Sequence, residues 1–215
     1  MNVMVEGAYV LAAYLLGAIP VAYVLGKARR VDLTTAGSGN LGAGNTTRLL
    51  GAKAGALVAL LDGAKGLAAV FVGRWMSLSP GVTAVGALAA VAGSNWSIYL
   101  WRRSGRGLAT SSLAMLAFDP ITVLWPGVWS VLGWKIGGGI SGFFGWAFLW
   151  MAAYALGRPP ETVLLAAGMG LLMIIRRAQG NLDDLGQKGP VARVLYDTDH
   201  RRSPAEIASG EESLA

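Results

Sequence analysis

A short polar stretch at residues 36–48, AGSGNLGAGNTTR, carries the groups that could bind an anion. Glycines allow successive backbone N–H groups to turn toward one anion, and serine and asparagine side chains add hydrogen-bond donors. Arg48 ends the stretch with a planar guanidinium group, which suits phosphate through two parallel hydrogen bonds. The residues that we expect to form this phosphate cradle are Gly37, Ser38, Gly39, Asn40, Gly42, Asn45 and Arg48. A flexible linker is the alternative interpretation.

The same stretch matches the dinucleotide-binding pattern G-x-G-x-x-G at residues 37–42, and Asp62 follows at the spacing of that pattern. The pattern functions only where a strand precedes it and a helix follows it. Here an apolar segment of membrane-spanning length precedes the glycines, and Asp62 lies inside another such segment. We therefore reject a dinucleotide site, and the lack of a following G-K-[ST] also rules out a P-loop.

Two ionisable residues, Asp62 and Lys65, lie inside the apolar segment 51–73. Their spacing of three places both on one face of a helix. Ionisable groups within a membrane span are costly and normally face a cavity or each other. We expect Lys65 to serve an anionic substrate while Asp62 holds the lysine in place. An ion pair that only aids helix packing is the alternative.

A third cationic feature, the sequence RRSGRG, follows the apolar segment 80–101. Arg106 has a glycine on each side, which favours close contact with an anion. The alternative is that these arginines only mark the cytoplasmic end of a membrane span, where positive charge is common.

The elements that would position these groups are apolar helices. The chain of 215 residues is 54% hydrophobic and 14% charged, has a mean hydropathy of +0.51, and contains 31 glycines. An ordinary soluble domain carries about 25% charged residues, and small residues let helices pack closely within a membrane. The sequence therefore predicts an all-α fold, a polytopic membrane helix bundle of about seven spans. The expected spans are 5–26 (with a kink at Pro20), 51–73, 80–101, 108–118, 121–134, 139–157 and 161–175. Five spans would remain if 108–118 and 121–134 only dip into the membrane.

Lysine and arginine gather in alternate loops, and basic loops face the cytoplasm. This pattern places the N-terminus outside and the C-terminus in the cytoplasm. Residues 1–182, with 14 basic and 5 acidic side chains, would form the membrane domain. Residues 183–215, with 4 basic and 7 acidic side chains, would form a polar cytoplasmic tail that is partly disordered.

The composition also excludes several kinds of partner. The chain has no cysteine and one histidine, His200 in the tail, so we expect no disulfide, no multi-histidine metal site and no cofactor. A basic membrane domain with an acidic tail argues against nucleic acid and suits anionic lipids or phosphate compounds. We expect the protein to be a monomer.

Together these features resemble one family, the bacterial membrane glycerol-3-phosphate acyltransferases that use acyl-phosphate as donor (the PlsY family). The family pattern G-S-G-N-x-G-A-T-N-x-x-R matches residues 37–48 except at Gly44, and its pattern D-x-x-K-G matches residues 62–66. The resemblance extends over residues 10–182. It implies seven spans in the bacterial inner (plasma) membrane, with an active site that faces the cytoplasm.

The resemblance further implies transfer of a fatty acyl group from acyl-phosphate to glycerol 3-phosphate, giving lysophosphatidic acid for phospholipid synthesis. Because acyl-phosphate is already activated, no acyl-enzyme is required, and a phosphate oxygen of the substrate is our candidate proton acceptor. The residues that would carry catalysis are Ser38, Asn45, Arg48 and Lys65. Those that would bind substrate phosphate are Gly37, Gly39, Asn40, Gly42, Arg106, Ser141 and Asn181, with Asp62 in support.

Two further family patterns, G-H-x-x-P…F-x-G-G-K-G and H-R-E-N-I, are matched only in part. Ser94 and Ala178 stand in place of histidines, Ser97 in place of proline and Arg106 in place of lysine, whereas Asn181 is retained. The alternative function is therefore a catalytically impaired homologue that binds phosphorylated ligands or partners another membrane enzyme. A transporter is disfavoured, because the first motif is not repeated in the second half of the chain.

Overall fold

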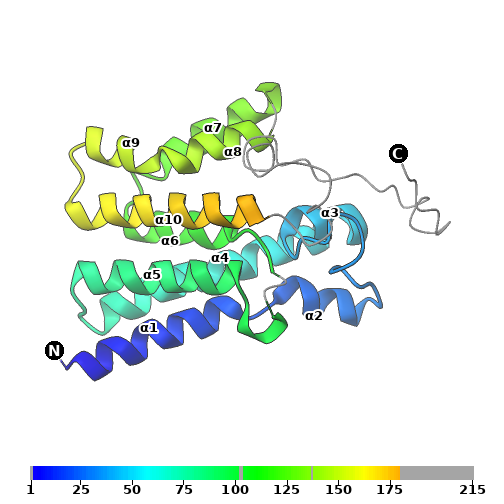
Figure 1. Cartoon of the computed structure of the whole chain (residues 1–215), viewed down its shortest axis with the longest axis horizontal. Helices are drawn as coiled ribbons and strands as arrows, with labels where there is room; N and C mark the ends of the chain where they lie inside the picture. The colour runs from blue at the N-terminus through cyan, green and yellow to red at the C-terminus, as the bar shows by residue number, and fades with distance from the viewer. Residues whose placement is uncertain (1, 102–103, 137, 180–215) are drawn as a thin grey trace.

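The computed structural model describes residues 2–101, 104–136 and 138–179. Within these ranges every regular element is a helix, as the sequence predicts. The longer helices lie side by side with roughly parallel axes, and α1 (Val3–Ala18) begins at the end of this bundle that is opposite α3 (Ala43–Leu50) (Figure 1). We refer to these two ends as the α3 end and the opposite end.

The first apolar segment forms two helices, α1 and α2 (Val21–Ala28), with a break at Ile19 and Pro20. Proline has no N–H, and its ring clashes with the preceding turn, so a regular helix does not continue through it. The predicted kink at Pro20 is therefore a full interruption. It leaves the last carbonyl groups of α1 without helical partners.

The stretch 36–48, predicted as one loop, is a loop only in its first half, because α3 begins after Gly42. This helix buries Asn45, and its two leucines, Leu49 and Leu50, come only in the last turn. An apolar periodicity that would indicate a helix is thus missing from the sequence. The prediction of a loop is wrong for residues 43–48.

The middle of the chain follows the predicted helical ranges. Its elements are α4 (Ala52–Trp75), α5 (Pro80–Asn95), the short 3-10 helix η1 (Ile98–Leu100) and α6 (Leu108–Phe118). Within the described part of the chain, three stretches are long and apolar enough to cross a membrane: Val3–Ala28, Ala52–Trp75 and Pro80–Leu100.

The last part of the bundle contains more breaks than predicted. Its elements are α7 (Leu124–Ile136), α8 (Gly138–Ala147), α9 (Leu149–Ala155) and α10 (Pro160–Gln179). The expected span 139–157 is interrupted at Phe148, which separates α8 from α9. Helix α10 runs past residue 175 and thereby includes Arg176 and Arg177.

The main apolar core lies between α4, α5, α6, α9 and α10. Its fully buried side chains include Val70, Val91, Met115, Leu149, Leu165 and Met169. Many other large apolar side chains lie on the outside, among them Leu60, Phe71, Leu124, Val131 and Leu164. Soluble monomers rarely expose so many apolar groups, whereas lipid tails cover such a surface.

Helices α1 and α5 approach each other through glycine. A Cβ atom added at Gly17 would overlap the backbone of Ala90, and one added at Gly93 would overlap the backbone of Tyr14. The missing side chains allow the two backbones to come into contact, as in other closely packed membrane helices. The position of α1 therefore depends on these two glycines.

At the opposite end, Asp119 fixes the turn between α6 and α7. Its carboxylate accepts hydrogen bonds from Arg158 Nε at 2.5 Å and from the backbone N–H groups of Ile121 and Thr122 at 3.0 and 3.4 Å. Burial alone would raise the pKa of Asp119, but these hydrogen bonds and the charge of Arg158 lower the pKa below its usual value. The carboxylate therefore stays ionised beside Arg158 at neutral pH.

The substitution Gly17→Ala should lower the free energy of unfolding by about 1–3 kcal/mol, because the new methyl group has no space against Ala90. The control is Gly7→Ala on the same helix, where an added Cβ meets no atom within 4 Å. That variant should be neutral or stabilising by up to about 1 kcal/mol. Thermal unfolding in detergent measures both, and equal effects would contradict the close α1–α5 contact.

Candidate functional site

The loop before α3 is ordered by one buried amide, Asn45. The Asn45 side chain is 1% exposed, and its Oδ1 accepts a hydrogen bond from the backbone N–H of Ser38 at 3.1 Å. Its Nδ2 donates to the carbonyl groups of Ala36 and Leu33 at 3.1 and 3.4 Å. Asn45 thus binds both ends of the glycine-rich turn, and the loop is a defined structure instead of a flexible linker.

The glycines of this loop have conformations that other residues rarely adopt. Gly37 and Gly39 have φ values of 63° and 65°. A Cβ atom at Gly37 would also overlap Oδ1 of Asn45. Alternation of such residues with ordinary ones turns neighbouring N–H groups to one side, which is the geometry of an anion-binding nest.

Helix α3 presents one polar face outward. Arg48 lies on its exposed side, four residues after Gly44, so the two share one face of the helix. The helix also packs on α4, where the Thr47 side chain lies against Gly55. Arg48 therefore stands on a helix whose position is fixed by packing, close in sequence to the ordered loop.

The loop after α5 lies against the glycine-rich loop. Gly105 approaches the carbonyl of Leu41 so closely that an added Cβ would lie 2.9 Å from its oxygen. Gly107 has a φ of 63° and precedes the first residue of α6. Arg106 is thus held between two constrained glycines, and the structure brings the first and third sequence motifs together.

Two buried arginines of α10 join this site, and the sequence analysis missed them as site residues. Arg176 is 6% exposed and donates to the carbonyl of Gly105 at 3.1 Å and to that of Ser104 at 3.0 Å. Arg177 is 3% exposed. Its guanidinium group packs against Gly142 on α8, where a Cβ atom added to the glycine would lie 2.5 Å from one guanidinium nitrogen. Two adjacent arginines at the end of a span are explained equally well by membrane topology, so the sequence contained no separate signal for them.

We call Arg106, Arg176 and Arg177 the arginine cluster. The charges of Arg106 and Arg176 interact unfavourably, and both arginines of α10 are removed from water. Ser141, which is 2% exposed, precedes Gly142 and so belongs to the same region. Guanidinium groups donate paired hydrogen bonds to carboxylate and phosphate groups, so the chemistry of the cluster is compatible with an anion.

Lys65 is buried and its hydrogen bonds are made inside the bundle. Its Nζ donates to Oδ1 of Asp62 at 2.6 Å, to the carbonyl of Ile19 at 2.5 Å and to that of Gly17 at 3.4 Å. The hydroxyl of Ser97 donates to the intervening carbonyl of Ala18 at 2.5 Å. These carbonyls lie at the C-terminal end of α1, where the break at Pro20 interrupts the helical hydrogen bonds, so Lys65 and Ser97 cap α1; the Ile19 carbonyl also accepts from the backbone N–H of Val21 at 3.1 Å. Direct contact of Lys65 with a substrate phosphate stays a prediction.

Asp62 is connected to the loop after α5 through three hydroxyl groups. Thr110 Oγ1 donates to the Asp62 carbonyl at 2.9 Å and lies 3.2 Å from Ser94 Oγ. Ser104 Oγ donates to the Ser94 carbonyl at 2.6 Å. The neighbouring Asn95 is fully buried, and neither polar atom of its side chain has a hydrogen-bond partner among the described residues. The helix caps and the arginine cluster are therefore parts of one packed region.

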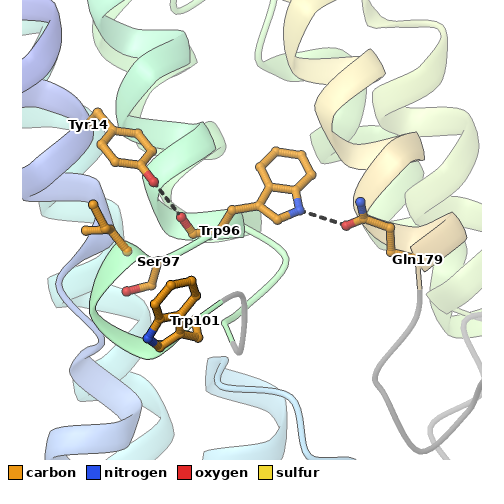
Figure 2. A pocket seen from close by; sticks show the side chains of 6 residues that line it. Tyr14, Trp96, Ser97, Trp101 and Gln179 are labelled. Atoms are coloured by element: carbon orange, nitrogen blue, oxygen red, sulfur yellow. Dashed lines mark hydrogen bonds between the residues drawn. The ribbon is translucent and has the colours of Figure 1, made fainter.

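Beside this region, Tyr14, Trp96, Ser97, Trp101 and Gln179 line a cavity of about 470 Å³. The Trp96 indole N–H donates to Gln179 Oε1 at 2.7 Å, and Tyr14 donates to the Trp96 carbonyl at 2.9 Å (Figure 2). These bonds join the ends of α1, α5 and α10.

Asn181, a predicted phosphate ligand, lies outside the described residues. Among the residues that are described, no three histidine, aspartate or glutamate side chains lie together as metal ligands would.

Comparison with known proteins identifies the kind of protein that has this geometry. A family model for glycerol-3-phosphate acyltransferase matches residues 7–188. The chain belongs to this family. A glycerol-3-phosphate acyltransferase of Thermus thermophilus is 37% identical over 172 residues, which cover 76% of this chain and 83% of the relative.

Other acyltransferase relatives are matched over a shorter region. Glycerol-3-phosphate acyltransferase 2 of Moorella thermoacetica is 43% identical over 114 residues, which cover 53% of this chain and 58% of the relative. The chain thus spans little more than half the length of this relative.

Solved structures show the same fold. A crystal structure of PlsY, an integral membrane glycerol 3-phosphate acyltransferase, in its glycerol 3-phosphate form has a TM-score of 0.75 and 29% identity. It matches 95% of this chain and 98% of the PlsY chain. The lysophosphatidic acid form matches with a TM-score of 0.74 and 27% identity.

The departures from the PlsY pattern now have structural positions. Ser94, in place of a histidine, is buried in the hydroxyl network, and Ser97, in place of a proline, caps α1. Gly44, in place of a threonine, lies on α3 where an added Cβ meets no atom within 4 Å. The chain has therefore replaced two family residues with hydrogen-bonding serines, while position 44 retains space for a larger side chain.

The substitution Lys65→Met should lower the free energy of unfolding by about 3 kcal/mol or more, because it removes the cation beside the Asp62 carboxylate and the side-chain donor to the carbonyls of Gly17 and Ile19. The double variant Asp62→Asn/Lys65→Met removes the unpaired charge and should recover part of this loss. Thermal unfolding in detergent measures both variants. If Lys65→Met kept full stability and only weakened substrate binding, the capping role of Lys65 would be wrong.

Proposed function

We propose that this protein transfers a fatty acyl group from acyl-phosphate to the hydroxyl group of glycerol 3-phosphate, giving lysophosphatidic acid. Membership of the acyltransferase family supports the proposal, and so does the likeness to PlsY structures with substrate and product. The observation that carries it is the meeting of the glycine-rich loop with the arginine cluster at the α3 end. Both proposed substrates are phosphate compounds, which this collection of donors suits.

The proposed reaction needs positioning and charge stabilisation more than a protein base. The acceptor oxygen forms a bond to the acyl carbon, the bond between that carbon and the phosphate oxygen breaks, and inorganic phosphate leaves. The hydroxyl proton goes to a phosphate oxygen of the substrate, since the one histidine of the chain, His200, lies in the tail. Arginine side chains and backbone N–H groups would stabilise the negative charge on the reacting groups.

We assign two kinds of role to the site residues. Phosphate contacts would come from Arg48, Arg106, Ser38, Asn40 and the backbone of Gly37, Gly39 and Gly42. We assign the same role to Arg177, Ser141 and Asn181. Positioning roles would belong to Asn45, Lys65 and Asp62, because their described hydrogen bonds go to the loop, to α1 and to each other.

We also propose how the protein lies in the membrane. Seven spans would be α1 with α2, α4, α5 with η1, α6, α7, α8 with α9, and α10. The α3 end would face the cytoplasm, because Lys27, Arg29, Arg30, Arg48 and Lys53 lie in or beside its first loop. The N-terminus would then lie outside the plasma membrane and residues 183–215 in the cytoplasm. We further propose that the protein is a monomer.

Purified protein with hexadecanoyl phosphate and glycerol 3-phosphate should form lysophosphatidic acid, detected by mass spectrometry. Arg48→Lys keeps the charge but loses the planar fork, and Arg106→Ala loses the charge, so each should reduce kcat/KM at least tenfold, about 1.4 kcal/mol. The control is Arg29→Lys in the same basic loop, which should stay within about twofold.

Folded wild-type protein that binds glycerol 3-phosphate but forms no product would favour the impaired homologue. Unchanged kinetics of Arg48→Lys or Arg106→Ala would remove that arginine from the site.

A further inference from the structure

Arg176, a buried arginine near the end of α10, donates hydrogen bonds to a loop from another part of the chain. Its Nε donates to the carbonyl of Gly105 at 3.1 Å, and its Nη2 donates to the carbonyl of Ser104 at 3.0 Å. These are the two residues that directly precede Arg106. A guanidinium group holds its N–H groups in one plane, so it fixes both peptide groups at once. The backbone position of Arg106 is therefore tied to α10.

The same loop is enclosed from two further sides. An added Cβ atom at Gly105 would lie 2.9 Å from the carbonyl oxygen of Leu41, and one at Gly107 would overlap Oδ1 of Asn95. Residues 104–107 thus lie between the glycine-rich loop, the end of α5 and α10. The glycines permit these close approaches, and the hydrogen bonds from Arg176 hold the loop in the space that they leave.

The end of α10 is itself attached to α5, so Arg176 acts from a fixed helix. Gln179 follows Arg176 by three residues and therefore lies near it on one side of α10. Its Oε1 accepts a hydrogen bond from the Trp96 indole N–H at 2.7 Å, just after the last residue of α5 (Figure 2). The two helices also pack on each other along their length. Arg176 thus connects a packed pair of helices to the loop.

We propose that Arg176 is a positioning residue, which holds the loop 104–107 and thereby keeps Arg106 beside the glycine-rich loop. It acts through the backbone of the loop and not through contact with the substrate. Arg177, to which we assign a phosphate contact, is the next residue of the same helix, so one turn of α10 sets the placement of both Arg106 and Arg177. This inference rests on the proposed function, because it takes Arg106 as a phosphate-binding group.

Amide hydrogen exchange of the ligand-free protein tests the loop contact alone. Arg176→Met removes both donors but keeps a long side chain, so exchange in peptides from residues 104–111 should become at least about fivefold faster. The matched control is Arg158→Met, because Arg158 also donates from its guanidinium group, but to Asp119 at the opposite end. That variant should leave exchange of residues 104–111 within about twofold. Unchanged exchange in Arg176→Met, or equal acceleration in both variants, would overturn the proposal.

A double-mutant cycle with Arg106→Ala tests whether Arg176 acts through Arg106. In the wild-type background, Arg176→Met should raise the Kd for glycerol 3-phosphate at least about tenfold, whereas in Arg106→Ala it should change the Kd less than about twofold, because the positioned group is gone. Equal factors in both backgrounds would mean that Arg176 contacts the substrate itself or only stabilises the fold, and would overturn the proposal.

Arg176→Lys is a second variant, which keeps donors for the two carbonyls but loses the planar fork. It should raise the Kd by only about threefold and accelerate exchange less than Arg176→Met does. It carries the same comparisons if Arg176→Met does not fold.

The two measurements separate this inference from the proposed function. Faster exchange in Arg176→Met, together with wild-type protein that binds no glycerol 3-phosphate, would support the loop contact and reject the proposed function. Binding and turnover in the wild type, with exchange unchanged in Arg176→Met, would do the reverse.

Discussion

The buried ammonium group of Lys65 holds together the part of the bundle on which the site is built. Pro20 interrupts the first span, and carbonyl groups without partners at the end of α1 would be costly in an apolar surrounding. Lys65 donates to the carbonyls of Gly17 and Ile19 and pairs with Asp62, whose backbone carbonyl accepts the hydroxyl of Thr110. One ionic group thereby links α1, α4 and α6, and the chain can leave the first span toward the glycine-rich loop.

Once these helices are held together, two further sets of contacts position the candidate site at the α3 end. Asn45 orders the loop from one side, and Gly105 closes onto it from the other. The arginines of α10 reach the same place because α10 stays helical beyond its apolar part. The result is a cationic region at the α3 end, which would suit the phosphate groups of the proposed substrates.

The sequence predicted the helical fold well, because long apolar runs in this chain have few other possible structures. It also indicated a structured glycine-rich stretch before residue 43 and the contact between Asp62 and Lys65, and it singled out Arg106 as a candidate anion ligand. It did not predict α3, whose polar residues fold through the tertiary hydrogen bonds of Asn45, nor the break at Phe148. Arg176 and Arg177 were indistinguishable from topology signals until packing placed Arg176 beside Gly105 and Arg177 against Gly142. The partners of Lys65 could not be predicted either, since they are backbone carbonyls more than forty residues away.

The central claim is that the glycine-rich loop and the arginine cluster form one phosphate site. A crystal or cryo-EM structure of the protein with bound glycerol 3-phosphate tests this most directly. Our account predicts the phosphate group within hydrogen-bonding distance of Arg106 and of at least one backbone N–H group in residues 37–42. A phosphate bound elsewhere in the bundle, with this loop and Arg106 making no contact to it, would contradict the account.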